Sequence, residues 1–372
     1  MNPATSRLLD LAIAIQQIPA PTFHEAARAG FVRARFLEEG LTDVETDAAG
    51  NVYACLKPAH APSSVVHGPL VVSAHLDTVF PPSVDLAVTR EPERILGPGI
   101  GDNALGVAGL FGLVWTLRER GLSLPGEVWL VANTCEEGLG DLRGMRLVAD
   151  RFGVRARAYL VLEGMALGQV YHRGLGVRRC RVSVSTEGGH SWIDYGQPSA
   201  IHELTAISSR ITALSLPRLP RTSLNIGVIS GGSSVNTIAA EASLELDLRS
   251  EDASTLDALF RQVEEIVRTA EKPGVTAVLE VIGSRPWGEI SASHPLVCLG
   301  QDCLRAAGVE PRLNIGSTDA NLPLSRGLPA ITMGLTTGGK GHTVHEFINL
   351  PPLERGMDSL TRLVSRVWEG GF

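Results

Sequence analysis

Three segments of the chain are hydrophobic at nearly every position: 70–74, 128–132 and 158–162. Continuous rather than alternating hydrophobicity is typical of strands that are buried on both faces of a sheet. Between the first two segments, apolar residues recur at helical spacing over 103–120, and Gly121 follows, which predicts a helix that ends there. These patterns together predict an α/β fold in which helices flank a sheet.

The pattern changes near residue 176. Three segments then alternate apolar and polar residues, as antiparallel strands with one solvent-facing side do: 177–185, 223–229 and 242–249. Helical spacing lies between them at 199–214 and 255–270, and after Trp287 the first pattern returns. Helices are then expected at 296–307 and 353–368, with a strand at 330–333. We therefore expect an α+β domain at 176–287, inserted into a domain made of 1–175 and 288–372.

Composition narrows the functional classes. The chain has 372 residues with a formal net charge of -7, and no block of Lys and Arg is present, so a nucleic-acid partner is not expected. No apolar run reaches the roughly 18 residues of a membrane span. The apolar stretch at 8–18 is interrupted by Asp10 and predicts a first helix rather than a signal peptide. Five cysteines without a Cys-x-x-Cys pair indicate reduced thiols in a cytoplasmic protein.

Candidate chemistry is concentrated at the ends of the predicted elements. Most of the candidate residues follow the three buried strands, whose carboxyl ends form the edge where α/β sheets bind ligands. In chain order, the candidates are His75, Asp77, Asp102, Glu136, Glu137, Glu163 and His342. Imidazole nitrogens and carboxylate oxygens are zinc ligands, and two zinc ions about 3.5–4 Å apart can activate water and hold a carbonyl. The pattern therefore predicts a metal-dependent amide or peptide hydrolase, although Asp102 alone could be an ordinary helix N-cap.

The motifs around these residues resemble a known family. They are His75-Leu76-Asp77-Thr78-Val79, Gly101-Asp102-Asn103, Glu136-Glu137-Gly138, Leu162-Glu163-Gly164, Gly189-His190-Ser191 and His342-Thr343-Val344-His345-Glu346-Phe347. In this order, over essentially the whole length, the chain is similar to the dinuclear zinc exopeptidases typified by aminoacylase, carboxypeptidase G, peptidase T and succinyl-diaminopimelate desuccinylase. The resemblance implies a catalytic domain with a mixed sheet flanked by helices, an inserted α+β lid and dimerisation domain, and a cis peptide bond after Asp102.

The resemblance also implies two divalent metal ions, with Zn²⁺ expected first and Co²⁺ or Mn²⁺ as alternatives. Asp102 would bridge the two ions, because a carboxylate offers one oxygen to each. His75 and Glu163 would complete the ligands of one ion, and Glu137 and His342 those of the other. The last ligand is open between two histidines, and we favour His342 because it stands four residues before a glutamate, as the family ligand does.

Further roles follow from the same resemblance. Asp77 would orient the histidine two residues before it, and Glu136 would be the general base. His190, from a second subunit, would stabilise the oxyanion of the tetrahedral intermediate. Arg249 would bind the free carboxylate of the substrate, for which its forked donors are suited. Asn236 would contact substrate, or it could simply belong to a glycine-rich hairpin loop.

The expected enzyme is a homodimeric carboxypeptidase or N-acyl amino acid deacylase that cleaves an amide bond next to a free carboxylate. Glu163 favours this group, because aminopeptidases such as peptidase T have aspartate at that position. His345-Glu346-Phe347-Ile348 instead resembles peptidase T, which keeps a di- or tripeptide aminopeptidase as the alternative. A non-catalytic binding module is the alternative from another class, but such proteins normally lose ligands or the base, and this chain retains them all.

Overall fold

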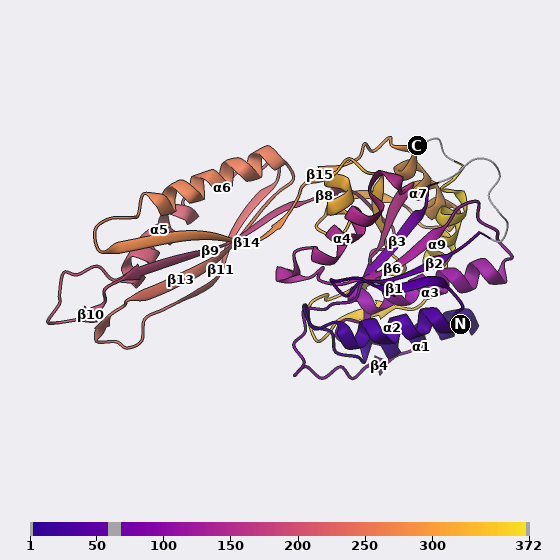
Figure 1. Cartoon of the computed structure of the whole chain (residues 1–372), viewed down its shortest axis with the longest axis horizontal. Helices are drawn as coiled ribbons and strands as arrows, with labels where there is room; N and C mark the ends of the chain where they lie inside the picture. Colours follow the sequence, from indigo (N-terminus) through magenta and orange to yellow (C-terminus); the bar gives the residue numbers. More distant parts are fainter. Residues whose placement is uncertain (1–2, 59–67, 370–372) are drawn as a thin grey trace. The chain divides into compact units, whose positions relative to one another are not determined.

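The computed structural model describes residues 3–58 and 68–369 and divides into two compact units. The first unit consists of Met1–Gly174 and Gly288–Phe372, and the second of Leu175–Trp287. The chain therefore leaves the first unit once and returns to it, as Figure 1 shows by colour along the sequence. Each unit has its own cluster of buried hydrophobic side chains.

A nine-stranded mixed sheet forms the centre of the first unit, in the order β1-β2-β6-β3-β7-β17-β8-β15, with β16 paired to β8. Its strands are β1 (Thr42–Thr46), β2 (Val52–Leu56), β3 (Leu70–His75), β6 (Val128–Asn133), β7 (Ala158–Leu162), β8 (Gln169–Gly174), β15 (Gly288–Glu289), β16 (Arg312–Gly316) and β17 (Ala330–Met333). The central strands β6, β3 and β7 run parallel, and every residue of β3 and β7 is buried. The three hydrophobic segments of the sequence are these three strands, and their burial explains why they do not alternate.

Helices cover this sheet. They are α1 (Pro3–Gln16), α2 (Ala26–Glu38), α3 (Leu105–Glu119), α4 (Arg143–Phe152), α7 (Pro295–Ala306), α8 (Asn321–Ser325) and α9 (Leu353–Arg366), with short turns η1 (Ile100–Ala104), η2 (Gly138–Gly140) and η3 (Gly153–Arg155). Among the described residues, only Ile100–Glu119 is long and apolar enough to pass for a membrane span by length and composition. An 18-residue stretch of that segment is 89% buried inside the protein, as in the core helix of a globular unit.

A small four-stranded sheet in the same unit, ordered β18-β19-β5-β4, joins segments that are far apart in sequence. Its strands are β4 (Thr89–Arg90), β5 (Arg94–Leu96), β18 (Gly338–Gly339) and β19 (Phe347–Asn349). The antiparallel pairing of β5 with β19 brings the segment that leads to Asp102 beside the segment that carries His342. This sheet therefore determines where two of the expected metal ligands lie.

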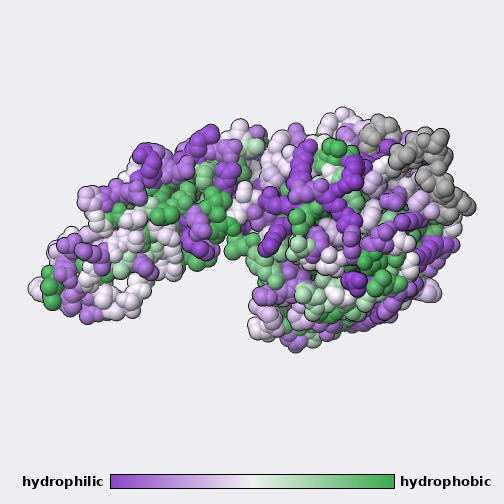
Figure 2. Space-filling view, in the orientation of Figure 1, coloured by the Kyte–Doolittle hydropathy of each residue, from purple (hydrophilic) through white to green (hydrophobic). Residues whose placement is uncertain are grey.

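The second unit is an antiparallel sheet, ordered β11-β13-β9-β14, with two helices packed on it. Its elements are β9 (Gly176–Thr186), β10 (Gly189–His190), α5 (Ala200–Thr212), β11 (Thr222–Gly231), β12 (Thr237–Ile238), β13 (Glu241–Ser250), α6 (Ala253–Arg268) and β14 (Val275–Arg285). The three alternating segments and both helical segments of the sequence correspond to β9, β11, β13, α5 and α6. Hydrophobic residues are also visible on the surface of this unit in Figure 2, and Val228, Ile229, Val278 and Val281 are among its exposed side chains.

Candidate active site

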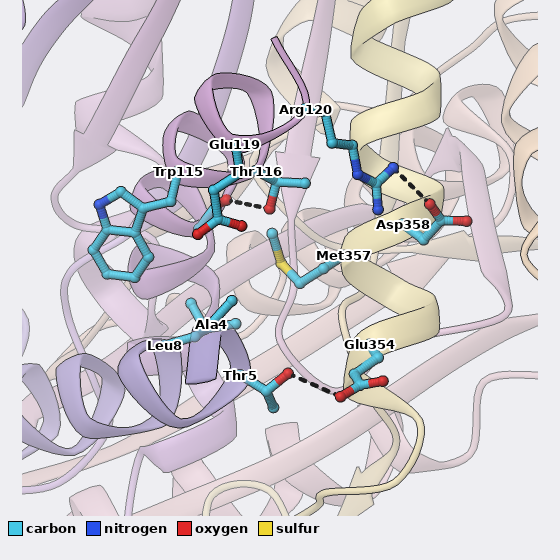
Figure 3. A pocket seen from close by; sticks show the side chains of 11 residues that line it. Ala4, Thr5, Leu8, Trp115, Thr116, Glu119, Arg120, Glu354, Met357 and Asp358 are labelled. Carbon is cyan, nitrogen blue, oxygen red and sulfur yellow. Dashed lines mark hydrogen bonds and ion pairs between the residues drawn. The ribbon is translucent and has the colours of Figure 1, made fainter. Parts of the chain in front are cut away.

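One surface pocket of the first unit is lined by residues other than the candidates. A cavity of about 280 Å³ lies among α1, α3 and α9, and none of the candidate residues lines it. In Figure 3, Thr5 donates to Glu354 at 3.3 Å, and Arg120 forms an ion pair with Asp358 at 2.8 Å. No residue that lines this pocket belongs to a group of described side chains that could hold a metal ion.

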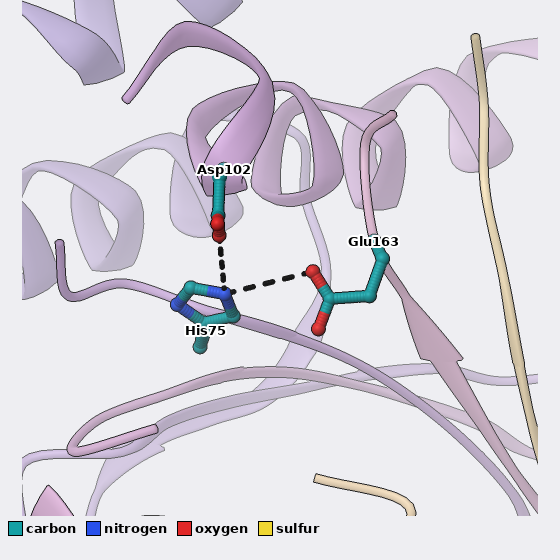
Figure 4. Close-up of side chains that lie close together, drawn as sticks. All are labelled: His75, Asp102 and Glu163. Atoms are coloured by element: carbon teal, nitrogen blue, oxygen red, sulfur yellow. Dashed lines mark ion pairs between the residues drawn. The ribbon is translucent and has the colours of Figure 1, made fainter. Parts of the chain in front are cut away.

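The candidate residues instead converge beyond the carboxyl end of β3. His75 is the last residue of that strand and is 2% exposed. Its Nε2 lies 3.1 Å from Asp102 Oδ1 and 3.7 Å from Glu163 Oε2 (Figure 4). Glu163 directly follows β7, the neighbour of β3 in the sheet, so parallel strands bring these two side chains to the same edge.

A second group of side chains surrounds the other oxygen of Asp102. His342 Nε2 lies 3.1 Å from Asp102 Oδ2 and 3.1 Å from Glu137 Oε1. Within each group, possible ligand atoms lie within 4.8 Å of one another. The two oxygens of one aspartate thus face two different histidines, each accompanied by one further carboxylate. His345, the alternative last ligand, is exposed and belongs to neither group.

The electrostatics of this cluster reflect crowded negative charge. Burial raises the pKa of Glu163, and the nearby charges of Asp102 and Glu137 add to that effect. Hydrogen bonds with Asp102 and Glu137 raise the pKa of His342 to about 10. Burial opposes protonation of His75, yet its hydrogen bonds with the surrounding carboxylates hold its pKa well above the ordinary value.

In the metal-free protein, the two imidazolium ions therefore supply the positive charge that the carboxylates need. Two histidines and three carboxylates are also a donor set that suits zinc or a similar divalent cation. Such a cation binds the neutral imidazole, so it would replace these protons. The residues present therefore fit a metal centre on their own chemistry.

Asp77 lies beside His75 and also binds the backbone of the two adjacent glutamates. Its Oδ1 accepts from the backbone N–H of Glu136 at 2.9 Å, and its Oδ2 accepts from that of Glu137 at 2.8 Å. The carboxylate lies 3.5 Å from Nδ1 of His75, whereas the backbone carbonyl of Asp77 lies 3.0 Å from the same nitrogen. The carbonyl is therefore the closer partner of the ring, and the carboxylate mainly fixes the loop that carries the adjacent glutamates. Thr22, which also donates to Asp77 at 2.9 Å, has no sequence signal of its own.

Glu136 and Glu137 follow β6 after a sharp turn. Cys135 has a left-handed φ of 57°, which is uncommon for a residue with a side chain. Its backbone N–H donates to the buried carboxylate of Glu25 at 3.0 Å, which holds this conformation. Glu136 is 5% exposed and groups with His75 and Glu137. A carboxylate this close to the candidate ligands can serve as a proton acceptor.

The segment after Asp102 differs from an ordinary helix start. Asp102 has a non-helical φ of -117° and ψ of 85°, and the N-cap of α3 is Ala104, so Asp102 is not a helix cap. The peptide bond between Asp102 and Asn103 is cis, as the family resemblance implied. Asn103 donates to the carbonyl of Leu162 at 2.7 Å and accepts from Gly164 at 3.0 Å. It therefore holds the backbone on both sides of Glu163, a role that only the folded structure reveals.

A buried acid that the sequence did not single out also lies near the centre. Asp319 is fully buried, and Asn133 at the end of β6 donates to it at 2.7 Å. Burial raises the pKa of Asp319 to about 7, and the negative charge of Glu163 contributes to that rise. Asp319 ends the motif Gly316-Ser317-Thr318-Asp319, but this motif does not indicate that the residue lies near the candidate ligands.

The remaining expected residues lie in the second unit. His190 pairs with Thr237 in the short β10–β12 ladder, and Ser191 donates to the carbonyl of Asn236 at 3.0 Å, so His190 and Asn236 are neighbours. Nδ1 of His190 accepts from the backbone of Trp192 at 3.2 Å. Arg249, on β13, forms an ion pair with Asp247 at 2.6 Å.

All five cysteines are free, as expected. Four are buried and Cys298 is exposed. Burial raises the pKa of Cys135 to about 12, which keeps its thiol protonated although Glu136 is the next residue. None of the five cysteines is among the possible metal-ligand groups of the described residues.

Comparison with known proteins identifies the family. The model of peptidase family M20/M25/M40 matches residues 71–366. A putative succinyl-diaminopimelate desuccinylase of Mycobacterium tuberculosis is 24% identical over 95% of this chain and 97% of its own, and carboxypeptidase G2 of a Pseudomonas species is 22% identical over 99% and 90%. The structure of a tripeptidase from Staphylococcus aureus superimposes with a TM-score of 0.81 at 21% identity, covering 98% of this chain and 99% of that one.

The chain therefore belongs to peptidase family M20/M25/M40. It is an enzyme of the hydrolase class, in a family that depends on metal ions, and the resemblance drawn from its motifs is confirmed. The structural likeness to the tripeptidase, at 21% identity, shows a shared fold.

The protonation of His342 generates a prediction for the metal-free protein. Its pKa is raised from 6.5 to about 10, so above pH 6.5 the folded state holds a proton that the unfolded chain has released. This stabilisation is complete below pH 6.5 and is lost as the pH rises through about 10. Urea unfolding with a chelator present should therefore show stability falling over this range. His342→Gln should reduce the slope, and equal slopes in the two proteins would contradict the assignment.

Proposed function

We propose that this protein is a metal-dependent exopeptidase or N-acyl amino acid hydrolase that cleaves an amide bond next to a free carboxylate. The observation that carries the proposal is the arrangement around Asp102, whose Oδ1 and Oδ2 each lie 3.1 Å from a different histidine. A carboxylate shared in this way can offer one oxygen to each of two neighbouring cations. Relatives named carboxypeptidase G2 and acetylornithine deacetylase support this substrate class.

We propose that the cluster holds two divalent cations, with Zn²⁺ favoured and Co²⁺ or Mn²⁺ as alternatives. His75 and Glu163 would hold one ion, Glu137 and His342 the other, and Asp102 both. Such ions, when bound, polarise a carbonyl and lower the pKa of water. Asn103 and Asp77 keep the ligands in place, because each is hydrogen-bonded to the backbone beside a ligand.

Glu136 is the proposed general base. It would take a proton from the attacking water and deliver it to the leaving amine. Two features support this role: its carboxylate is 5% exposed beside the ligands, and its backbone is held by Asp77 at 2.9 Å. A positioned carboxylate with little access to solvent can pass a proton between two sites without exchanging it with bulk water.

The substrate-binding roles rest on three residues of the second unit. Arg249 would bind the substrate carboxylate, and its ion pair with Asp247 holds the guanidinium on β13. Nδ1 of His190 accepts backbone hydrogen bonds, so the neutral ring carries its proton on Nε2. That N–H could donate to an oxyanion. Asn236, beside His190, would contact the same substrate.

We further propose a cytoplasmic homodimer formed through the second unit, in which His190 serves the site of the other subunit. Large exposed side chains next to His190 support an interface there: Trp192 is 84% exposed, Ile193 77% and Tyr195 89%. Exposed apolar side chains gathered in this way are typical of protein contact sites. The free cysteines are consistent with a reducing compartment.

Glu136→Gln gives the first test. The substitution removes the base but keeps the size of the side chain and its place beside Asp77. Turnover should fall by roughly 10²–10⁴-fold. Metal content, measured by mass spectrometry of the purified protein, should stay at the wild-type value. Near-normal turnover in this variant would remove Glu136 from the mechanism.

A substrate comparison tests the reaction class. N-acetyl amino acids and dipeptides with a blocked amino terminus should be hydrolysed. The same compounds with a carboxamide in place of the free carboxylate should not, because Arg249 would have no carboxylate to bind. Arg249→Lys should raise KM more than it lowers kcat, since the bidentate contact is lost while the charge remains. Preferential hydrolysis of free-amine tripeptides would instead favour the aminopeptidase alternative.

Mixing two inactive variants tests the dimer. In a dimer of Glu136→Gln with His190→Ala, one of the two sites has both an intact base and an intact histidine if His190 crosses between subunits. Subunit exchange at equal amounts should then restore about a quarter of wild-type activity, by the symmetry of a two-fold dimer. If activity stays at the level of the separate variants although exchange is verified, His190 does not serve the other subunit.

A further inference from the structure

Glu346 is a buried carboxylate that contacts the backbone of Asp102. It is 0% exposed and lies four residues after His342. Its Oε1 accepts from the backbone N–H of Gly101 at 2.7 Å and from that of Asp102 at 2.9 Å. Its backbone carbonyl accepts from Gly97 at 2.9 Å. One residue thus binds the segment before and at Asp102 through three hydrogen bonds.

Only one of the two carboxylate oxygens makes these contacts. Oε2 of Glu346 is buried and has no hydrogen-bond partner among the described residues. The carboxylate therefore contacts this segment through one acceptor atom, Oε1, which faces the adjacent N–H groups of Gly101 and Asp102.

Backbone hydrogen bonds connect Glu346 to the turn that carries His342. Glu346 directly precedes β19, which pairs with β5, and Gly97 directly follows β5. The turn from Lys340 to Glu346 is closed by two backbone hydrogen bonds, Thr343 to Lys340 at 3.2 Å and Glu346 to Thr343 at 3.1 Å. His342 lies inside the first of these two hydrogen-bonded turns, and Glu346 ends the second. Whatever fixes Glu346 against Asp102 therefore also fixes His342 against Asp102.

We propose that Glu346 is a positioning residue that clamps the His342 turn to the backbone of Asp102 and so sets the spacing of those two ligands. The inference rests on the proposed two-cation centre. It affects the ion of His342 and Glu137 most, because the other ion has ligands positioned independently: His75 by the end of β3, and Glu163 by Asn103.

Calorimetric titration of the metal-free full-length protein with Zn²⁺ tests this inference. Wild type should bind two equivalents. Glu346→Ala, which removes the acceptor, should bind the second equivalent about 10–100-fold more weakly, the usual effect of losing a group that orients ligands. Glu346→Asp, too short by one methylene to reach both N–H groups, should lie in between. Glu346→Gln keeps one acceptor oxygen and should retain the second equivalent near the wild-type affinity.

Asp252→Ala is the matched control. Asp252 accepts the backbone N–H of Thr255 at 2.7 Å in the second unit, so its loss removes a similar contact far along the chain from the ligands. Circular dichroism and the first Zn²⁺ equivalent report whether each variant is folded. If Glu346→Ala does not fold, Glu346→Asp and Glu346→Gln still separate loss of the acceptor from loss of the charge.

The outcomes distinguish the two proposals. A wild-type protein that binds fewer than two equivalents overturns the two-cation centre and the clamp with it. Two equivalents in wild type, with unchanged affinity in Glu346→Asp and in any folded Glu346→Ala, overturn the clamp alone. A loss in Glu346→Gln as large as in Glu346→Asp also overturns it, because the charge rather than the acceptor would then be essential.

Discussion

The mutual repulsion of carboxylates around Asp102 is the constraint on which the site depends. Glu137 and Glu163 each have an oxygen within 4.8 Å of Asp102, in surroundings where burial makes charge costly. Such a cluster is stable only when positive charge is present, and in the structure two histidines provide it. The protein around the cluster resists its tendency to spread, through a rigid sheet edge and through hydrogen bonds to the backbone beside each acidic residue.

The fold divides this work between two kinds of scaffold. The parallel strands β3, β6 and β7 are almost completely buried, so His75 and Glu163, and the turn that bears Glu136, begin from fixed points. Asp102 and the His342 turn come from connections instead, and the small sheet that contains β5 and β19 joins these connections. Loops therefore carry candidate metal ligands here, and strand pairing and buried acceptors hold the backbone of these loops.

The buried strands could be predicted from the sequence, because continuous hydrophobicity is a local signal, and the ends of these strands drew attention to His75, Glu136 and Glu163. The alternating strands β9, β11 and β13 could be predicted for the same reason. Asn103, Thr22 and Asp319 could not, since each acts through a partner that is distant in sequence, such as Asn133 for Asp319. The orientation of His75 was also out of reach, because a carbonyl and a carboxylate of the same residue compete for one ring nitrogen.

The chain leaves the first unit after Gly174 and returns to it at Gly288, and these two residues are neighbours in the main sheet. Gly174, the last residue before it, pairs with Gly288, the first residue after it, in the antiparallel contact of β8 with β15. The main sheet therefore keeps its register whatever the connection between these glycines contains. In evolutionary terms, such a junction lets a whole module be exchanged by recombination without re-threading the scaffold. A change within this module would leave the sheet edge that carries the candidate ligands outside the exchanged segment.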